Sequence, residues 1–171
     1  MAVKTNAELA AFFNTGDQPS EAEFGHLIDT IQPPHVQLAT NANTSLTVAS
    51  HAFRTLIMGN ISTGVELQLP AAAADVWFHI VYLPLAADAH TLVIKTGTLN
   101  SHFFEGSIIH SETDDAGVGN DDIVAGNGSS NDHINIISAK HADIWIHGKN
   151  TTNWYVYGHV VGDDNTQIAD S

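Results

Sequence analysis

The sequence contains no cysteine and only five lysine and arginine residues among its 171 positions. The absence of cysteine excludes disulfide bonds, thiolate zinc sites and cysteine nucleophiles. Nineteen aspartate and glutamate residues outnumber the five basic ones and leave a formal net charge of −14. A chain this acidic repels a phosphate backbone and offers few cations to an anionic lipid surface. We therefore expect neither nucleic acid nor a membrane among its partners.

Long hydrophobic runs and familiar catalytic motifs are also missing. No stretch approaches the ~20 apolar residues that a membrane-spanning helix needs, and no basic segment followed by an apolar one suggests a secretory signal peptide. The nucleophile elbow, the phosphate-binding loop, the dinucleotide fingerprint and the zinc-protease motif are absent. No two histidines stand one residue apart, as a cupin metal site would require. These absences predict a protein that is not an enzyme, although two distant aspartates forming a glycosidase-type pair are compatible with the sequence.

Residues 1–34 predict an N-terminal arm of two short amphipathic helices. Ser20 is a suitable N-cap, and Glu23 three residues later completes a capping box. The apolar stripe of the second helix, which ends before two prolines, consists of Phe24, Leu27, Ile28 and Ile31. The apolar face of the first helix consists of Leu9, Phe12 and Phe13. Helices this short are marginal alone in water, so the hairpin needs a partner surface, either on its own domain or on a neighbouring subunit.

Residues 35–171 predict one antiparallel β-domain, a sandwich of jelly-roll-like type. Short β-rich runs recur about every ten residues and are separated by glycine, asparagine, aspartate and serine, a spacing typical of sandwiches and barrels. The expected strands are Ser45–Ala49, Phe53–Met58, Val65–Leu69, Val76–Leu83, Thr91–Lys95, Ser107–His110, Ile123–Ala125, Ile134–Ser138, Ile144–His147 and Trp154–Val161. The residues from Asp163 onward predict a loose polar tail.

One strand pattern occurs twice. Residues 74–79, with the sequence ADVWFH, resemble residues 142–147, with the sequence ADIWIH. Aspartate, tryptophan and histidine alternate in both and therefore share one face of a strand. The repeat is explained either by equivalent strands in two similar halves or by chance. The run Val76–Leu83 is apolar at successive positions, which predicts a central strand covered on both sides, and we expect His79 to be a satisfied core or interface histidine rather than a metal ligand.

The loop from Asp114 to Ile134 is rich in glycine, asparagine and aspartate. It resembles two imperfect nonapeptides of the calcium-binding β-roll repeats, in which carboxylate and carbonyl oxygens coordinate Ca²⁺. Asp121 and Asp132 are the candidate ligands. A roll closes its ion sites only by stacking several repeats, so the alternative interpretation is an ordinary polar loop without a cofactor.

The last apolar segments predict a hairpin with its turn at Lys149–Asn153. Trp154 and Val156 fall on one face of its second strand, and Tyr155 and Tyr157 fall on the other. Exposed aromatic side chains of this kind bind sugars or fill a contact between subunits. We therefore include Trp154, Tyr155 and Tyr157 among the expected partner or subunit interface residues, together with the apolar stripes of the two N-terminal helices.

Three segments resemble virion proteins of tailed bacteriophages. They are Thr15-Gly16-Asp17-Gln18-Pro19-Ser20-Glu21-Ala22-Glu23-Phe24 with Leu27-Ile28-Asp29, then Leu69-Pro70-Ala71-Ala72, and then Asn153-Trp154-Tyr155-Val156-Tyr157-Gly158. The first is similar to their N-terminal helical element, and the others are similar to the entry and the finish of their β-domains. Gly25 and His26 depart from the usual helical pattern. The resemblance covers about a third of the chain, in separate pieces.

The resemblance implies a structural virion protein, assembled in the host cytoplasm. The compact chain favours a head-decoration (cement) protein, which would trimerise and bind the major capsid protein through apolar helix faces and sheet edges. A tail fibre that binds host-surface carbohydrate is the alternative, and a calcium-binding β-module is a further one. Neither virion role requires a cofactor.

Overall fold

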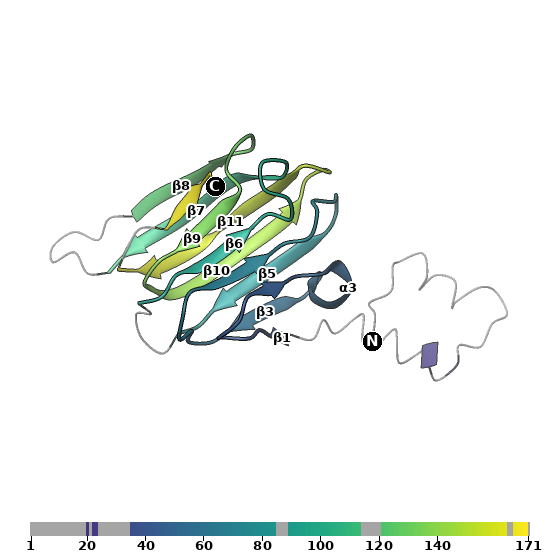
Figure 1. Cartoon of the computed structure of the whole chain (residues 1–171), viewed down its shortest axis with the longest axis horizontal. Helices are drawn as coiled ribbons and strands as arrows, with labels where there is room; N and C mark the ends of the chain where they lie inside the picture. The colour runs from purple at the N-terminus through teal and green to yellow at the C-terminus, as the bar shows by residue number, and fades with distance from the viewer. Residues whose placement is uncertain are drawn as a thin grey trace.

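The computed structural model describes residues 20, 22–23, 35–84, 89–113, 121–163 and 166–170, and this part of the chain is mainly β-structure in two mixed sheets (Figure 1). Its elements in chain order are β1 (Val36–Gln37), β2 (Thr44–Ser45), α3 (Val48–His51), β3 (Thr55–Met58), β4 (Val65–Gln68), β5 (Trp77–Tyr82), β6 (Leu92–Lys95), β7 (Phe103–Glu112), β8 (Asp121–Asn127), β9 (His133–Ile136), β10 (Ala139–Gly148), β11 (Asn153–Gly162) and β12 (Gln167–Ala169). Every strand from β3 to β11 overlaps one that the sequence predicts.

The seven-stranded sheet has the strand order β1-β3-β5-β10-β11-β7-β8, and the five-stranded sheet has the order β12-β9-β6-β4-β2. Strand β5 is an interior strand, as its apolar sequence predicts. The expectation of purely antiparallel pairing is wrong. Strand β3 pairs in parallel with β1 on one side and with β5 on the other. Strand β4 pairs in parallel with β2 and with β6, and β11 pairs in parallel with β7. The chain passes through the five-stranded sheet at β2 and β4 between strands β1, β3 and β5 of the seven-stranded sheet, and such crossings permit parallel neighbours. Alternation alone specifies only which face each side chain occupies.

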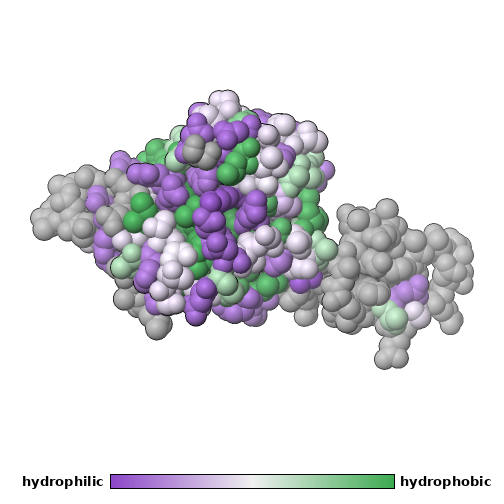
Figure 2. All heavy atoms as spheres, viewed as in Figure 1, coloured by the Kyte–Doolittle hydropathy of each residue, from purple (hydrophilic) through white to green (hydrophobic). Residues whose placement is uncertain are grey.

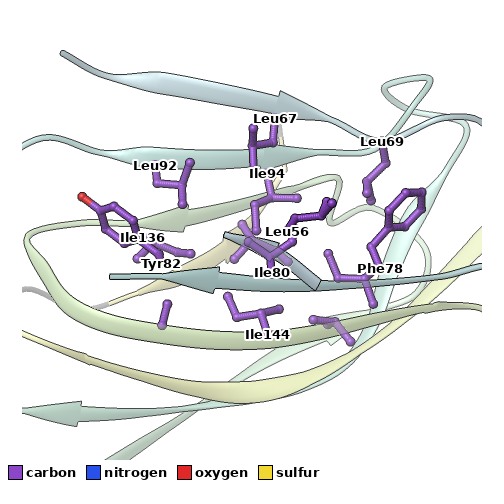
Figure 3. Packing of buried hydrophobic residues seen from close by; sticks show 14 of the residues in the cluster. Leu56, Leu67, Leu69, Phe78, Ile80, Tyr82, Leu92, Ile94, Ile136 and Ile144 are labelled. Atoms are coloured by element: carbon purple, nitrogen blue, oxygen red, sulfur yellow. The ribbon is translucent and has the colours of Figure 1, made fainter. Parts of the chain in front are cut away.

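The two sheets share one hydrophobic core, to which each contributes the apolar side chains of its inner face (Figure 3). Phe78, Ile80 and Tyr82 of β5 point toward Leu92 and Ile94 of β6, and all five are fully buried. Burial of each large side chain contributes about 1.5–3 kcal/mol. The alternation of buried and half-buried residues along β5 leaves a second, outward-facing row on the seven-stranded sheet. The expectation that β5 is fully covered on both sides is therefore wrong.

Two local predictions are also wrong. The run Ser45–Ala49 is not one strand, because it divides between β2 and the helical turn α3 that Thr47 caps. The expected polar tail contains β12, which pairs with β9 at the edge of the five-stranded sheet. Ile168 supplies the reason, since this single apolar side chain is buried against the core.

At the N-terminus the structure confirms the capping box. The Ser20 backbone N–H donates to Glu23 Oε2 at 2.7 Å, and the Glu23 N–H donates to Ser20 Oγ at 3.3 Å. This reciprocal pair satisfies donors that a first helical turn leaves open. The predicted stripes formed by Leu9, Phe12 and Phe13 and by Phe24, Leu27, Ile28 and Ile31 lie outside the described residues. Within the described part, no helix has the length and apolar character that crossing a membrane requires.

The short helix α3 gives the domain a specific dependence on pH. Burial lowers the pKa of His51, and the charge of Arg54 acts in the same direction. The neutral ring accepts a hydrogen bond from the Thr47 N–H at 3.0 Å. Folding therefore favours neutral His51, and its contribution to stability is present above the ordinary pKa of about 6.5 and is lost as pH falls below it.

We expect the protein to lose more stability between pH 7.5 and 5.5 than its His51→Asn variant, because asparagine can still accept from the Thr47 N–H but does not titrate. The measurement is the urea midpoint of both proteins at both pH values. Comparing the two proteins cancels the contributions of the other histidines. Equal losses in the two proteins would contradict this assignment.

Candidate functional site

The outer face of the seven-stranded sheet carries the most unusual set of side chains in the described chain. We define this outer face as the outward-pointing residues of β3, β5, β10, β11, β7 and β8, which alternate with core residues along each strand. Its central members are Trp77, His79, Val81, Asp143, Trp145, His147, Tyr155, Tyr157, His159, Ser107, Ile109 and Ile123. Most of these residues are half-buried or exposed.

The repeated Asp-Trp-His pattern builds the middle of this face. Its two copies lie on β5 and β10, which are adjacent antiparallel strands of the same sheet and not equivalent strands of two halves. The antiparallel register places Trp145 opposite His79 and His147 opposite Trp77, so each tryptophan meets the histidine of the other copy. The rings of His79 and Trp145 stack with centroids 4.0 Å apart and planes 11° apart.

Two hydrogen bonds fix the imidazole of His79. Thr55 Oγ1 lies 3.0 Å from Nδ1, and Asp143 Oδ1 lies 2.8 Å from Nε2. The expectation that His79 is satisfied is therefore confirmed, and its carboxylate partner comes from the neighbouring strand. Since both ring nitrogens are engaged and one ring side packs on Trp145, this chain of contacts fixes the orientation of an aromatic surface.

Further rings extend the stack across β11. Trp145 and Tyr157 are nearly parallel, with planes 3° apart and centroids separated by 6.3 Å. His147 stacks on Tyr157 at 5.6 Å, and Tyr155 adjoins Tyr157 at 6.1 Å. We call the resulting set the aromatic belt; it comprises Phe53, Trp77, His79, Trp145, His147, Tyr155 and Tyr157. Tyr155 is 45% exposed and Tyr157 is 42% exposed, so the belt is most accessible at β11.

An aliphatic pair continues the outer face beyond the belt. Ile109 of β7 lies directly opposite Ile123 of β8, and the two side chains are 48% and 74% exposed. Next to this pair, Ser111 Oγ lies 2.8 Å from His159 Nε2 and donates to Asp121 Oδ1 at 2.6 Å. The outer face therefore combines exposed apolar groups with polar groups that are already bonded to one another. The view in Figure 2 shows hydrophobic residues interspersed with hydrophilic ones over the surface that it presents.

The charge of the outer face is acidic. Asp143 and Asp121 lie on it, and Glu105 binds Lys149 through both carboxylate oxygens at 2.7 Å. The other described lysines are paired elsewhere, Lys95 with Glu66 at 2.6 Å and Lys140 with Asp163 at 2.6 Å. Thus the positive charge of each described lysine is offset by a carboxylate of the same chain.

The two faces of the second strand of the C-terminal hairpin are as predicted, but the prediction that Trp154 is an interface residue is wrong. Trp154 is fully buried and packs edge-on against Phe78 with centroids 5.7 Å apart, so it belongs to the core and is inaccessible to a partner. It occupies this place because it alternates with Tyr155 along β11. Tyr155 and Tyr157 do face outward. Sequence reasoning did not include Trp145, His147, Ile109 or Ile123, although the repeated pattern was a signal for the first two.

The two candidate calcium ligands do not lie together. Asp121 is opposite Ser111 near the end of β7, whereas Asp132 follows Asn131, whose carbonyl accepts from Phe104 at the start of β7. Seven residues of extended chain separate these positions by roughly 23 Å. Asp132 is fully buried and its carboxylate binds the Asn100 N–H and the His133 ring. No group of three or more metal-ligating side chains occurs among the described residues. Residues 114–120 lie outside the described chain, so calcium binding there stays a prediction.

Comparison of the chain with protein-family models, with curated proteins and with solved structures found no match. Two of the three segments that resemble phage proteins lie in the described domain.

Proposed function

We propose that this protein is a structural component of a tailed-phage particle, a head-decoration protein that trimerises and binds the major capsid protein. The observation that carries the proposal is the outer face, an aromatic and aliphatic surface on a rigid sheet. Its histidine and aspartate side chains are engaged in orienting that surface. Such a surface suits adhesion between proteins, because aromatic anchors dominate the binding energy of interfaces. The N-terminal resemblance to virion proteins supports the same assignment.

The dimensions of the outer face fit this role. Seven strands at about 4.8 Å spacing, with two to ten residues each and about 3.3 Å per residue, cover roughly 34 by 23 Å. This area is close to the ~800 Å² per partner that a standard-size interface buries. The apolar part is concentrated at β11, β7 and β8, where Tyr155, Tyr157, Ile109 and Ile123 are most exposed. A partner that covers these strands would remove most of the exposed apolar surface of the sheet.

We further infer that the two sheets form a sandwich of the kind that virion β-domains use. A jelly-roll-like connectivity and the N-terminal helical hairpin stay predictions, as do the trimer, the location in the virion and the absence of an enzymatic activity. In this assignment the hairpin is a docking arm and the sheet domain is the body of each subunit.

Replacement of Phe24 by aspartate is expected to abolish incorporation into particles, because a carboxylate in the predicted apolar stripe prevents its burial on a neighbour. The assay mixes purified protein with undecorated heads and quantifies the bound fraction after sedimentation. Circular dichroism and the urea midpoint of the variant should match those of the wild type, since the sheet domain is unchanged.

The matched control is Glu21→Gln, a substitution near Phe24 that leaves the apolar stripe intact and should incorporate normally. Normal incorporation of the Phe24→Asp variant would contradict the docking arm. Failure of the wild-type protein to bind undecorated heads would contradict the decoration role itself.

A tail-fibre role in carbohydrate binding is the second candidate function. The exposed rings of Tyr155 and Tyr157 favour it, since aromatic side chains on the surface of a β-domain can bind sugars. It predicts that a host-surface glycan raises the melting temperature, because a ligand that binds only the folded state stabilises it. The decoration role predicts no such shift, and calcium with chelator provides the same test for a metal-binding module.

A further inference from the structure

We propose that the outer face binds a partner surface that presents arginine and lysine side chains around an apolar centre, and that this basic surface is the partner's half of the docking contact. The inference rests on the proposed function, which it extends by naming the chemistry of the partner. It is carried by three features of the described chain: its charge, the orientation of its rings and the position of its exposed isoleucines.

The charge of the chain favours a basic partner. The sequence has nineteen acidic residues and five basic ones, and Lys95, Lys140 and Lys149 are each bonded to a carboxylate. Arg54 lies at the start of β3 with its Nε buried, away from the accessible part of the belt at β11. An acidic partner, or a second copy of this chain on the same face, would meet like charges, and such contacts oppose binding.

The aromatic belt provides the specific contacts for cations. A guanidinium or ammonium group is attracted to the face of a tryptophan or tyrosine ring within about 6 Å, most strongly where water is excluded. Tyr157 and Tyr155 are the accessible rings. Asp143 lies two residues before Trp145 on β10 and on the same face, with its side chain 45% exposed. A basic side chain can therefore contact a ring and a carboxylate together.

The isoleucine pair supplies the apolar centre. Ile109 and Ile123 are adjacent across β7 and β8, and both protrude from the face. Asp121 lies two residues before Ile123 along β8, so a carboxylate flanks the apolar centre at this end as Asp143 does nearer the belt. This arrangement is that of a protein interface, in which apolar residues are central and charges surround them.

The test titrates the isotopically labelled full-length protein with two synthetic peptides and follows its backbone amide resonances. One twelve-residue peptide alternates arginine with isoleucine, and the other replaces each arginine by glutamate. We expect the arginine peptide to shift residues of β7, β8, β10 and β11 selectively, the glutamate peptide to leave them unchanged, and the affinity to fall about tenfold between 50 and 500 mM salt.

Three variants locate the site. Tyr157→Ser and Asp143→Asn should each lower the affinity for the arginine peptide by about threefold or more. Glu66→Gln removes one equal charge from the five-stranded sheet and should leave this affinity unchanged. Shifts confined to the five-stranded sheet, equal binding of both peptides, or equal losses in Asp143→Asn and Glu66→Gln would overturn the proposal.

The two proposals fail separately. Normal incorporation of Tyr157→Ser and Asp143→Asn into heads, with no binding of the arginine peptide, would overturn the inference and leave the decoration role standing. Selective binding of the arginine peptide by a protein that does not attach to heads would support the basic partner and contradict the decoration role.

Discussion

Replacing Trp154 with alanine is expected to destabilise the domain by about 3–5 kcal/mol, the usual cost of deleting a large aromatic side chain from a packed core. Trp154 is among the largest fully buried side chains and contacts Phe78 edge-on. Its loss leaves a cavity in the core beside Phe78 that the surrounding strands cannot close, because β11 and β5 are both interior strands of the sheet. The measurement is equilibrium unfolding in urea, followed by circular dichroism.

The neighbouring Tyr155→Ala substitution is the control, because the same strand carries this ring on the outer face, where it is 45% exposed. We expect its free energy of unfolding to stay within about 1 kcal/mol of the wild-type value. Trp154→Phe should also lower the free energy of unfolding only slightly. The indole Nε1 is buried with no hydrogen-bond partner in the described chain, and phenylalanine retains an aromatic ring. Equal losses in Trp154→Ala and Tyr155→Ala would contradict the assignment of Trp154 to the core.

The pair Trp154 and Tyr155 also shows how much a single sequence reveals. Strict alternation assigned the two faces of β11 correctly, and the turn at Lys149–Asn153 placed β10 beside it. Alternation does not say which face is the core, so the tryptophan was assigned to an interface. The choice is made by the neighbours, Phe104 on β7 and Phe78 within the shared core, which are remote in sequence.

Parallel pairing lay beyond sequence reasoning for a related reason. Strands β11 and β7 are paired over ten successive positions, although about forty residues separate them. No turn signal marks such a contact, since turn residues report only local hairpins. Similarly, β12 contributes one buried side chain, Ile168, in a polar segment, which is too little for a periodic pattern.

Part of the outer face could be predicted from the sequence. The two Asp-Trp-His copies predicted aligned side chains, and the structure shows why the pattern repeats: antiparallel neighbours place each tryptophan against the histidine of the other. The bond between His79 and Asp143 joins the copies rather than forming within one of them. Ile109 and Ile123 carried no signal of their own, because their accessibility follows from the position of β8 at the edge of the sheet.

The substitution Gly106→Ala is expected to lower the free energy of unfolding by at least about 3 kcal/mol. It tests the parallel pairing of β7 with β11. Gly106 has a φ of 110°, a region that residues with a side chain rarely adopt. A Cβ at this position would overlap the carbonyl oxygen of Val156 on the parallel neighbour β11. Backbone strain of about 1–3 kcal/mol and the displacement of a paired strand therefore act together.

The matched control is Gly59→Ala, because a Cβ there would meet only the Thr40 methyl group at an ordinary 3.8 Å. Its free energy of unfolding should change by less than about 1 kcal/mol. The Gly106→Ala variant should also lose the ordered environment of the outer face, because β7 and β11 carry Ile109, Tyr155 and Tyr157. Wild-type stability in Gly106→Ala would show that β7 and β11 do not approach one another as described, and the proposed docking surface would lose its central strands.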